Sequence, residues 1–137
     1  MIEFNPAKLS VLAATNTPAL GKATQIMLLA MGFTKVEITP IKDVCARADA
    51  LKPTFILFSP EYLSMPMEER LTCGCPCPKK DKCGKALNVI FLKKKKIDSV
   101  LMSNDMGFDG IMFADQSMDR LFEALKTVYT SHEIHTK

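Results

Sequence analysis

Residues 54–59 read TFILFS, and this stretch decides the fold expected for the rest of the chain. It is apolar through its middle, without the alternation of polar residues that marks a strand with one solvated face. A short run of this kind predicts a strand that is buried on both faces. Such strands occur in parallel sheets covered by helices, so the stretch predicts an α/β domain.

Similar short apolar runs occur on both sides of this stretch. They predict further strands at 8–15 (KLSVLAAT), 36–39 (VEIT), 88–92 (NVIFL) and 110–114 (GIMFA).

Segments with helical spacing separate these strands. The first helix is expected to begin at Thr17-Pro18, as an N-cap followed by proline at the first helical position, and to end at Gly32. Other helices are expected over 41–51, from Ile97 to near Gly107, and from the cap Ser117 to Tyr129, with the tail SHEIHTK frayed. The apolar face of the first helix is predicted to comprise Leu20, Ala23, Ile26, Met27, Ala30 and Met31.

Alternating strands and helices imply a doubly wound, flavodoxin-like five-stranded parallel sheet of order 2-1-3-4-5 with right-handed crossovers. The chain of 137 residues is expected to form one domain, with a core over 8–129, a cysteine-rich loop over 66–87 and a tail over 130–137. In this fold ligands bind at the carboxyl ends of strands one and three. The loops predicted there are Ala13-Ala14-Thr15-Asn16 and Ser59-Pro60-Glu61.

Composition narrows the classes of protein to be considered. Apolar residues make up 47% of the chain and charged residues 24%, as in ordinary globular proteins, and no apolar run is long enough to cross a bilayer. The N-terminal MIEFNPAKLS lacks the pattern of a signal peptide, so we expect a cytoplasmic protein. The net charge of +3 is uneven, since 79–96 carries eight lysines and one aspartate. One basic patch indicates a local partner surface, and not a general nucleic-acid binder.

From Lys8 to Tyr129 the chain resembles the receiver domain of bacterial two-component response regulators, a CheY-like fold. The resemblance is carried by KLSVLAATNTPAL, ALKPTFILFSPEYLSMP, NVIFLKKK and FDGIMFADQSMDRLFEALKTV, and no single motif in it is diagnostic. It implies a phosphorelay role, with an acidic pair after strand one that holds Mg²⁺ and a phospho-accepting aspartate at the end of strand three. It also implies a Ser/Thr after strand four and a Lys after strand five.

This chain departs from that pattern at nearly every position. The acidic pair falls on Ala13 and Ala14, the acceptor on Ser59 or Pro60, the Ser/Thr on Lys93, and the Lys on Ala114. Alanine cannot ligate Mg²⁺, which needs oxygen donors, and phosphoryl transfer then lacks both nucleophile and charge neutralisation. We therefore expect a pseudo-receiver that binds no Mg²⁺ and is not an enzyme.

Four of the five cysteines lie within eleven residues, at Cys73, Cys75, Cys77 and Cys83. Two prolines and two glycines disfavour a helix there, so a long loop is expected to replace the receiver helix between strands three and four. Four thiolates around one Zn²⁺ would order such a loop. The C-x-C spacing is tighter than usual zinc pairs and matches no usual iron–sulfur spacing, so an iron–sulfur cluster and a redox disulfide stay open. Cys45, on the apolar face of 41–51, is expected to pack in the core.

Three polar features near the predicted site have two readings each. Glu61 lies within two residues of the aligned acceptor and could mimic the phosphorylated state, with Lys93 as its partner, or be a surface carboxylate. Thr15-Asn16-Thr17 could bind phosphate at a helix N-terminus, although Thr17 is also explained as an N-cap. Lys93–Lys96 is either a contact for nucleic acid or an acidic partner, or a solvated helix start.

Two functions follow from these patterns. The first is a binding module that contacts another signalling protein, or a second copy of itself, through the face made by the helix after strand four, strand 110–114 and the last helix. The second is a metal or redox sensor in which the cysteine cluster changes the same face.

Overall fold

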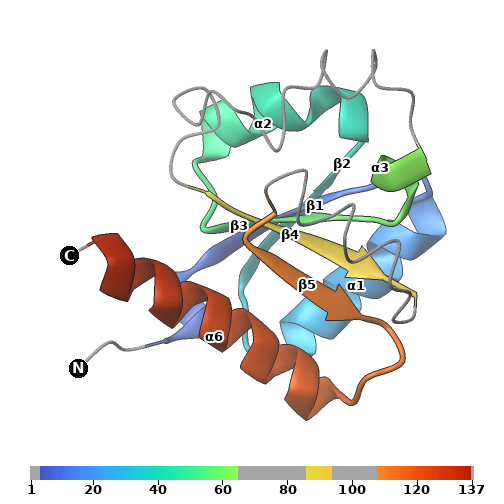
Figure 1. Cartoon of the computed structure of the whole chain (residues 1–137). Coiled ribbons are helices and arrows are strands. Elements are labelled where there is room, and N and C mark those ends of the chain that lie inside the picture. Colours follow the sequence, from blue (N-terminus) through green and yellow to red (C-terminus); the bar gives the residue numbers. More distant parts are fainter. Residues whose placement is uncertain (1–3, 65–85, 94–107, 137) are drawn as a thin grey trace.

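The structure is a computed structural model that describes residues 4–64, 86–93 and 108–136 (Figure 1). Its strands are β1 (Ser10–Ala14), β2 (Lys35–Thr39), β3 (Phe55–Phe58), β4 (Leu87–Leu92) and β5 (Gly110–Phe113). Its α-helices are α1 (Pro18–Ala30), α2 (Val44–Leu51), α3 (Glu61–Ser64) and α6 (Met118–Thr136), and two short 3-10 turns cover Pro6–Lys8 and Ile41–Asp43.

The five strands form one sheet of order β2-β1-β3-β4-β5, and every neighbouring pair is parallel. This confirms the predicted order 2-1-3-4-5. The predicted cysteine-rich loop over 66–87 lies outside the described residues up to residue 85, and Leu87 already belongs to β4.

The central strand β3 is buried along its whole length, as its sequence predicts. Phe55 and Leu57 point to the side covered by α1 and α6, where they pack with Leu28 and Leu125. The alternate residues of β3 point to the other side, into a cluster built with α2 and α3. That second cluster includes Ile56, Phe58, Val44, Ala48 and Tyr62. Helices therefore cover both faces of the sheet (Figure 1).

The helix ends follow the local sequence in most places. Proline begins α1, Gly32 beyond its end adopts φ +107°, and the Ser117 hydroxyl accepts a hydrogen bond from the Arg120 amide at 3.3 Å. Thr17 stands at the cap position of α1, but its side chain makes no capping hydrogen bond. The last helix extends past its predicted end at Tyr129, since α6 continues to Thr136 with no proline or glycine to stop it.

The predicted apolar face of α1 is partly wrong. Ile26 is 59% exposed and Ala23 and Ala30 are exposed, whereas Gly21 and Leu28 are buried. The helix carries a single charged residue, Lys22, so its sequence offers little contrast between an inner and an outer face.

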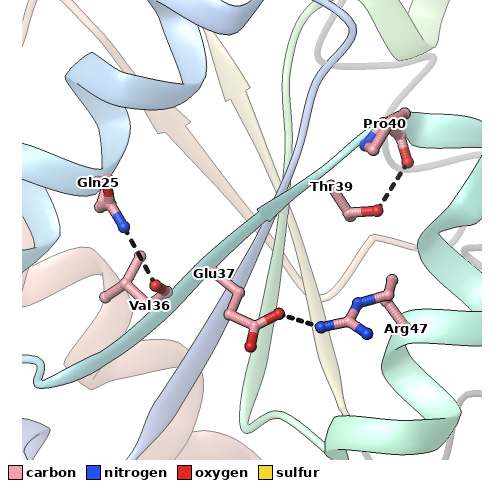
Figure 2. Close-up of polar contacts among 6 residues, drawn as sticks. All are labelled: Gln25, Val36, Glu37, Thr39, Pro40 and Arg47. Carbon is pink, nitrogen blue, oxygen red and sulfur yellow. Dashed lines mark hydrogen bonds and ion pairs between the residues drawn. The ribbon is translucent and has the colours of Figure 1, made fainter.

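The edge strand β2 has polar contacts with the helices on both sides, which Figure 2 shows. The Gln25 side-chain nitrogen Nε2 of α1 donates to the Val36 carbonyl at 3.3 Å, and Glu37 pairs with Arg47 of α2. The Thr39 hydroxyl donates to the Pro40 carbonyl at 3.1 Å. The Gln25 side chain therefore occupies one backbone carbonyl of this edge strand, and the charged pair lies on its surface, two features that disfavour pairing with another sheet.

Candidate functional site

The carboxyl ends of the strands form the rim at which the sequence placed a site. The strands end so that Thr15 and Asn16 follow β1, Ser59 follows β3, Lys93 follows β4 and Ala114 follows β5. The Ser59 amide donates to the Ala14 carbonyl at 3.0 Å, and the Thr15 amide donates to the Thr39 carbonyl at 3.0 Å. Backbone hydrogen bonds thus fix the first residues of these turns relative to one another.

The positions assigned to the acidic pair lie at the carboxyl end of β1. Ala13 and Ala14 are the last two residues of the strand and are 2% and 1% exposed. The two residues that follow are Thr15 and Asn16. None of these four residues carries a carboxylate.

Glu61 supplies a carboxylate to this rim from the start of α3. One of its oxygens, Oε1, accepts hydrogen bonds from the Thr15 hydroxyl, from the Ser59 hydroxyl at 2.8 Å and from the Asn16 amide at 3.2 Å. Thr15 Oγ1 in turn accepts from the Thr17 amide at 3.1 Å. The carboxylate therefore bridges the turn after β1 and the turn after β3.

The hydrogen bonds change the acidity of Glu61. Partial burial of the carboxyl acts to raise its pKa, but the hydrogen bonds it accepts, first from Thr15 and then from Ser59, outweigh that effect. The pKa of Glu61 is therefore lowered, and the group is ionised at neutral pH.

The predicted partner of this carboxylate is not its partner in the structure. Lys93 is exposed, and within residues 4–64, 86–93 and 108–136 the ion pair lies elsewhere, between Glu37 and Arg47. The predicted Lys93–Glu61 pair was wrong. Hydroxyl and amide donors satisfy Glu61 in its place.

Asn16 has a second contact that joins the rim to β2. Its side-chain oxygen accepts a hydrogen bond from the Ile41 amide at 3.1 Å. Together with the Thr15–Thr39 backbone bond, this contact holds the turn after β1 against the turn after β2.

A small cavity of about 20 Å³ lies next to this network, between α1 and the ends of β1 and β3. A space of this size holds about one water molecule. Its lining residues include Ala13, Thr15, Leu20, Thr24, Leu57 and Ser59. The Thr15 hydroxyl, proposed as a phosphate donor, is committed to Glu61, so the structure offers little support for a phosphate ligand of Thr15-Asn16-Thr17.

The predicted metal ligands Cys73, Cys75, Cys77 and Cys83 lie outside the described residues. Within the part of the chain that is described, no cluster of three or more His, Cys, Asp or Glu residues is arranged to hold a metal ion. Cys45 lies in α2, and its side chain is not among those described. No described helix is both long enough and apolar enough to pass through a membrane.

The contacts of Glu61 were missed by sequence reasoning, which looked for acidic and basic partners. A usable signal was present. Two hydroxyl residues, Thr15 and Ser59, directly follow strands that are adjacent in the predicted order, so their side chains were bound to meet at one edge. The buried position of Tyr62, next to Glu61, was also missed because a four-residue helix shows no periodic pattern.

Comparisons with known proteins show what this arrangement is similar to. No protein-family model and no curated protein matches the chain. Among solved structures, a LuxR-family DNA-binding response regulator from Staphylococcus aureus matches with a TM-score of 0.68 and 16% identity, over 88% of this chain and 98% of its own. The chemotaxis protein CheY4 of Vibrio cholerae has a TM-score of 0.68, 14% identity and the same coverage of both chains.

A putative pilus assembly-related protein from Burkholderia pseudomallei is similar over 95% of both chains, with a TM-score of 0.71 and 12% identity. The chain has the fold of a response-regulator receiver domain. At these identities the likeness establishes the CheY-like fold and leaves activity to be argued from the chain's own residues.

Proposed function

We propose that this chain is a cytoplasmic pseudo-receiver, a signalling domain that acts through protein contact without being phosphorylated and without enzymatic activity of its own. One observation carries the proposal. The first residues after β1, β3, β4 and β5 are Thr15, Ser59, Lys93 and Ala114, none of which is a carboxylate, and one oxygen of Glu61, which reaches the same rim, accepts three hydrogen bonds. Hydroxyl, ammonium and methyl groups at these four positions do not supply the anionic oxygen ligands that bind Mg²⁺ or the carboxylate that accepts a phosphoryl group.

The test is exposure of the purified protein to acetyl phosphate and Mg²⁺, followed by intact-mass spectrometry. We expect no acyl-phosphate adduct, with a receiver domain that retains its aspartate as the positive control. A stoichiometric adduct that hydroxylamine removes would overturn the proposal.

The contact face is proposed to include β5 and α6. An open hollow of about 520 Å³ runs along them, with an apolar floor that includes Ile111, Ala124 and Val128. Charged side chains of both signs, Asp119, Arg120 and Glu123, border it. An apolar centre with a charged border is the usual composition of a protein contact surface. The helix expected between residues 97 and 107, which belongs to the predicted face, lies outside the described residues.

The partner is proposed to be another signalling protein, with a second copy of the chain as the alternative. Sedimentation equilibrium distinguishes the two candidates. A homodimer doubles the measured mass, whereas a monomer leaves the face available to another protein. Nucleic acid is a poor candidate, since the charges beside the hollow are of both signs.

We further propose that Cys73, Cys75, Cys77 and Cys83 hold one Zn²⁺ that orders the segment after α3. The support is the sequence spacing alone. Elemental analysis and a visible spectrum of anaerobically purified protein test it. About one zinc per chain without colour is expected, and no metal with four titratable thiols would contradict it.

The same four cysteines are the basis of the alternative function, a metal or redox sensor. Iron with visible absorbance, or metal that exchanges while the protein stays folded, would favour the sensor. A structural zinc should leave only on unfolding.

A further inference from the structure

Glu61 occupies a position between two parts of the molecule that the proposed function does not connect. On one side its Oε1 atom accepts hydrogen bonds from the turn after β1, through Thr15 and Asn16, and from Ser59 after β3. On the other side Glu61 is the first residue of α3. Hydrogen bonds to an ionised acceptor are stronger than those between neutral groups, so this bridge restrains the first turn of α3.

The residue next to Glu61 is one of the most deeply placed aromatic side chains on its face of the sheet. Tyr62 is 3% exposed, and its ring lies 4.7 Å from that of Phe58 and 5.7 Å from that of Phe108. The Phe58 and Phe108 rings lie 5.5 Å apart, so the three rings contact one another pairwise. We call Phe58, Tyr62 and Phe108 the aromatic triad.

The aromatic triad connects the turn after β3 to the approach to β5. Phe58 is the last residue of β3, and Phe108 stands two residues before β5. The Asp109 amide, next to Phe108, donates to the Asn88 carbonyl of β4 at 2.7 Å. A shift of Tyr62 would therefore displace Phe108 and the start of β5, because packed rings cannot move independently of one another.

We propose that Glu61 is an internal latch. Its carboxylate holds the first turn of α3 against the turn after β1, which seats Tyr62 against Phe58 and Phe108. Whatever withdraws Glu61 from its hydroxyl and amide donors releases Tyr62 and loosens the chain before β5. The latch is a conformational device that links the rim to the β5 side of the molecule, and it holds whether or not the rim can be phosphorylated.

The tyrosine content makes the latch measurable. The chain has two tyrosines and no tryptophan, so Tyr129→Phe leaves Tyr62 as the single fluorescent reporter. Tyr129 belongs to the cluster on the opposite face of the sheet, and Tyr62→Phe leaves it as the reporter of that face. Acrylamide quenching of each reporter then reads one face at a time.

In the Tyr129→Phe background, Glu61→Ala is expected to remove the protection of Tyr62 from acrylamide. The Tyr62 and Leu63 amides, which donate to the Ser59 and Pro60 carbonyls at 3.1 Å each, should exchange roughly tenfold faster. Glu61→Gln keeps an acceptor oxygen in place and should give a smaller effect. Glu123→Ala, an exposed glutamate of α6, is the matched control and should change neither reporter.

The outcome that overturns the latch is unchanged Tyr62 quenching and amide exchange in Glu61→Ala. A general loss of stability would expose Tyr129 as well as Tyr62. Glu61→Ala is therefore also measured in the Tyr62→Phe background, where Tyr129 should stay protected from acrylamide if only the latch is released. If Glu61→Ala also exposes Tyr129, Thr15→Val replaces it, because this variant keeps the carboxylate and removes one donor. Unaltered Tyr62 protection in Thr15→Val and in the Thr15→Val, Ser59→Ala double variant would then reject the latch.

Discussion

At the scale of single residues, the Thr15 hydroxyl contacts Glu61, for which the sequence predicted Lys93 as the partner. It is 7% exposed, and its hydroxyl accepts from the Thr17 amide at 3.1 Å while donating to Glu61. Thr15→Val keeps the shape of the side chain and removes both hydrogen bonds. We expect it to lower the free energy of unfolding by about 1–2 kcal/mol, measured by urea denaturation.

A double-mutant cycle separates the hydrogen bond from other effects of the substitution. Thr15→Val, Glu61→Ala and the double variant should show a coupling of roughly 0.5–2 kcal/mol, since the two side chains are in direct contact. Thr15→Ser, which keeps the hydroxyl, is the control and should lose less stability than Thr15→Val. Additive effects of the two single changes would mean that the contact contributes nothing to stability.

The lowered pKa of Glu61 predicts how stability depends on pH. In the unfolded chain a glutamate has a pKa of about 4.3, and in the folded protein the pKa of Glu61 is lowered by the hydrogen bonds that it accepts. The contribution of the carboxylate is therefore complete above the unfolded pKa and is lost as the pH falls through the folded pKa. Glu61→Gln lacks this dependence, whereas other carboxyl groups titrate equally in both proteins.

The difference in unfolding free energy between wild type and Glu61→Gln should thus shrink when the pH is lowered from about 7 to about 3. Urea denaturation of both proteins at a series of pH values measures it. A difference that stays constant, or that grows towards acid, would show that Glu61 is not stabilised as the charged form.

At the scale of the elements, the approach of α6 to β5 depends on a glycine. A Cβ atom placed on Gly110 would lie 2.4 Å from Val128 Cγ2, a distance that real atoms do not adopt. Gly110→Ala should therefore destabilise the protein by about 1–3 kcal/mol, as overpacking does. Val128→Ala in the same chain opens that space, and the double variant should be less impaired than the sum of the two single variants.

The elements also show what sequence patterns decide and what they leave open. The bounds of α1 were predictable because Pro18 and Gly32 act through backbone geometry alone. The buried face of α1 was not, since apolar residues occur on all sides of the helix, and contacts with the sheet select Leu28 over Ile26. In β3 no such choice arises because both faces are covered.

At the scale of the whole molecule, the strand order and the position of the rim followed from the alternation of strands and helices. A parallel sheet brings its carboxyl ends together, so the sequence predicts Thr15, Ser59 and Glu61 at one edge. The sequence indicates that these groups are near one another, but not which hydroxyl donates to which oxygen, because that depends on where each strand ends to within one residue.

The two ends of the described chain are joined by aromatic rings. Phe4, which precedes the first element, lies 5.4 Å from the Phe122 ring and 5.5 Å from the Tyr129 ring of α6, and it also contacts Phe33 and Phe55. Residues before the first strand thus close one side of the core, which the sequence did not indicate.

Phe4→Ala should lower the free energy of unfolding by about 1–3 kcal/mol, less than for a fully buried phenylalanine, because Phe4 is only partly buried. In the Tyr62→Phe background it should also raise acrylamide quenching of Tyr129. Phe4→Leu, which keeps much of the apolar area, should restore most of both quantities. Unchanged stability in Phe4→Ala would mean that the N-terminal residues only rest on the domain, and that its cooperative unit begins at β1.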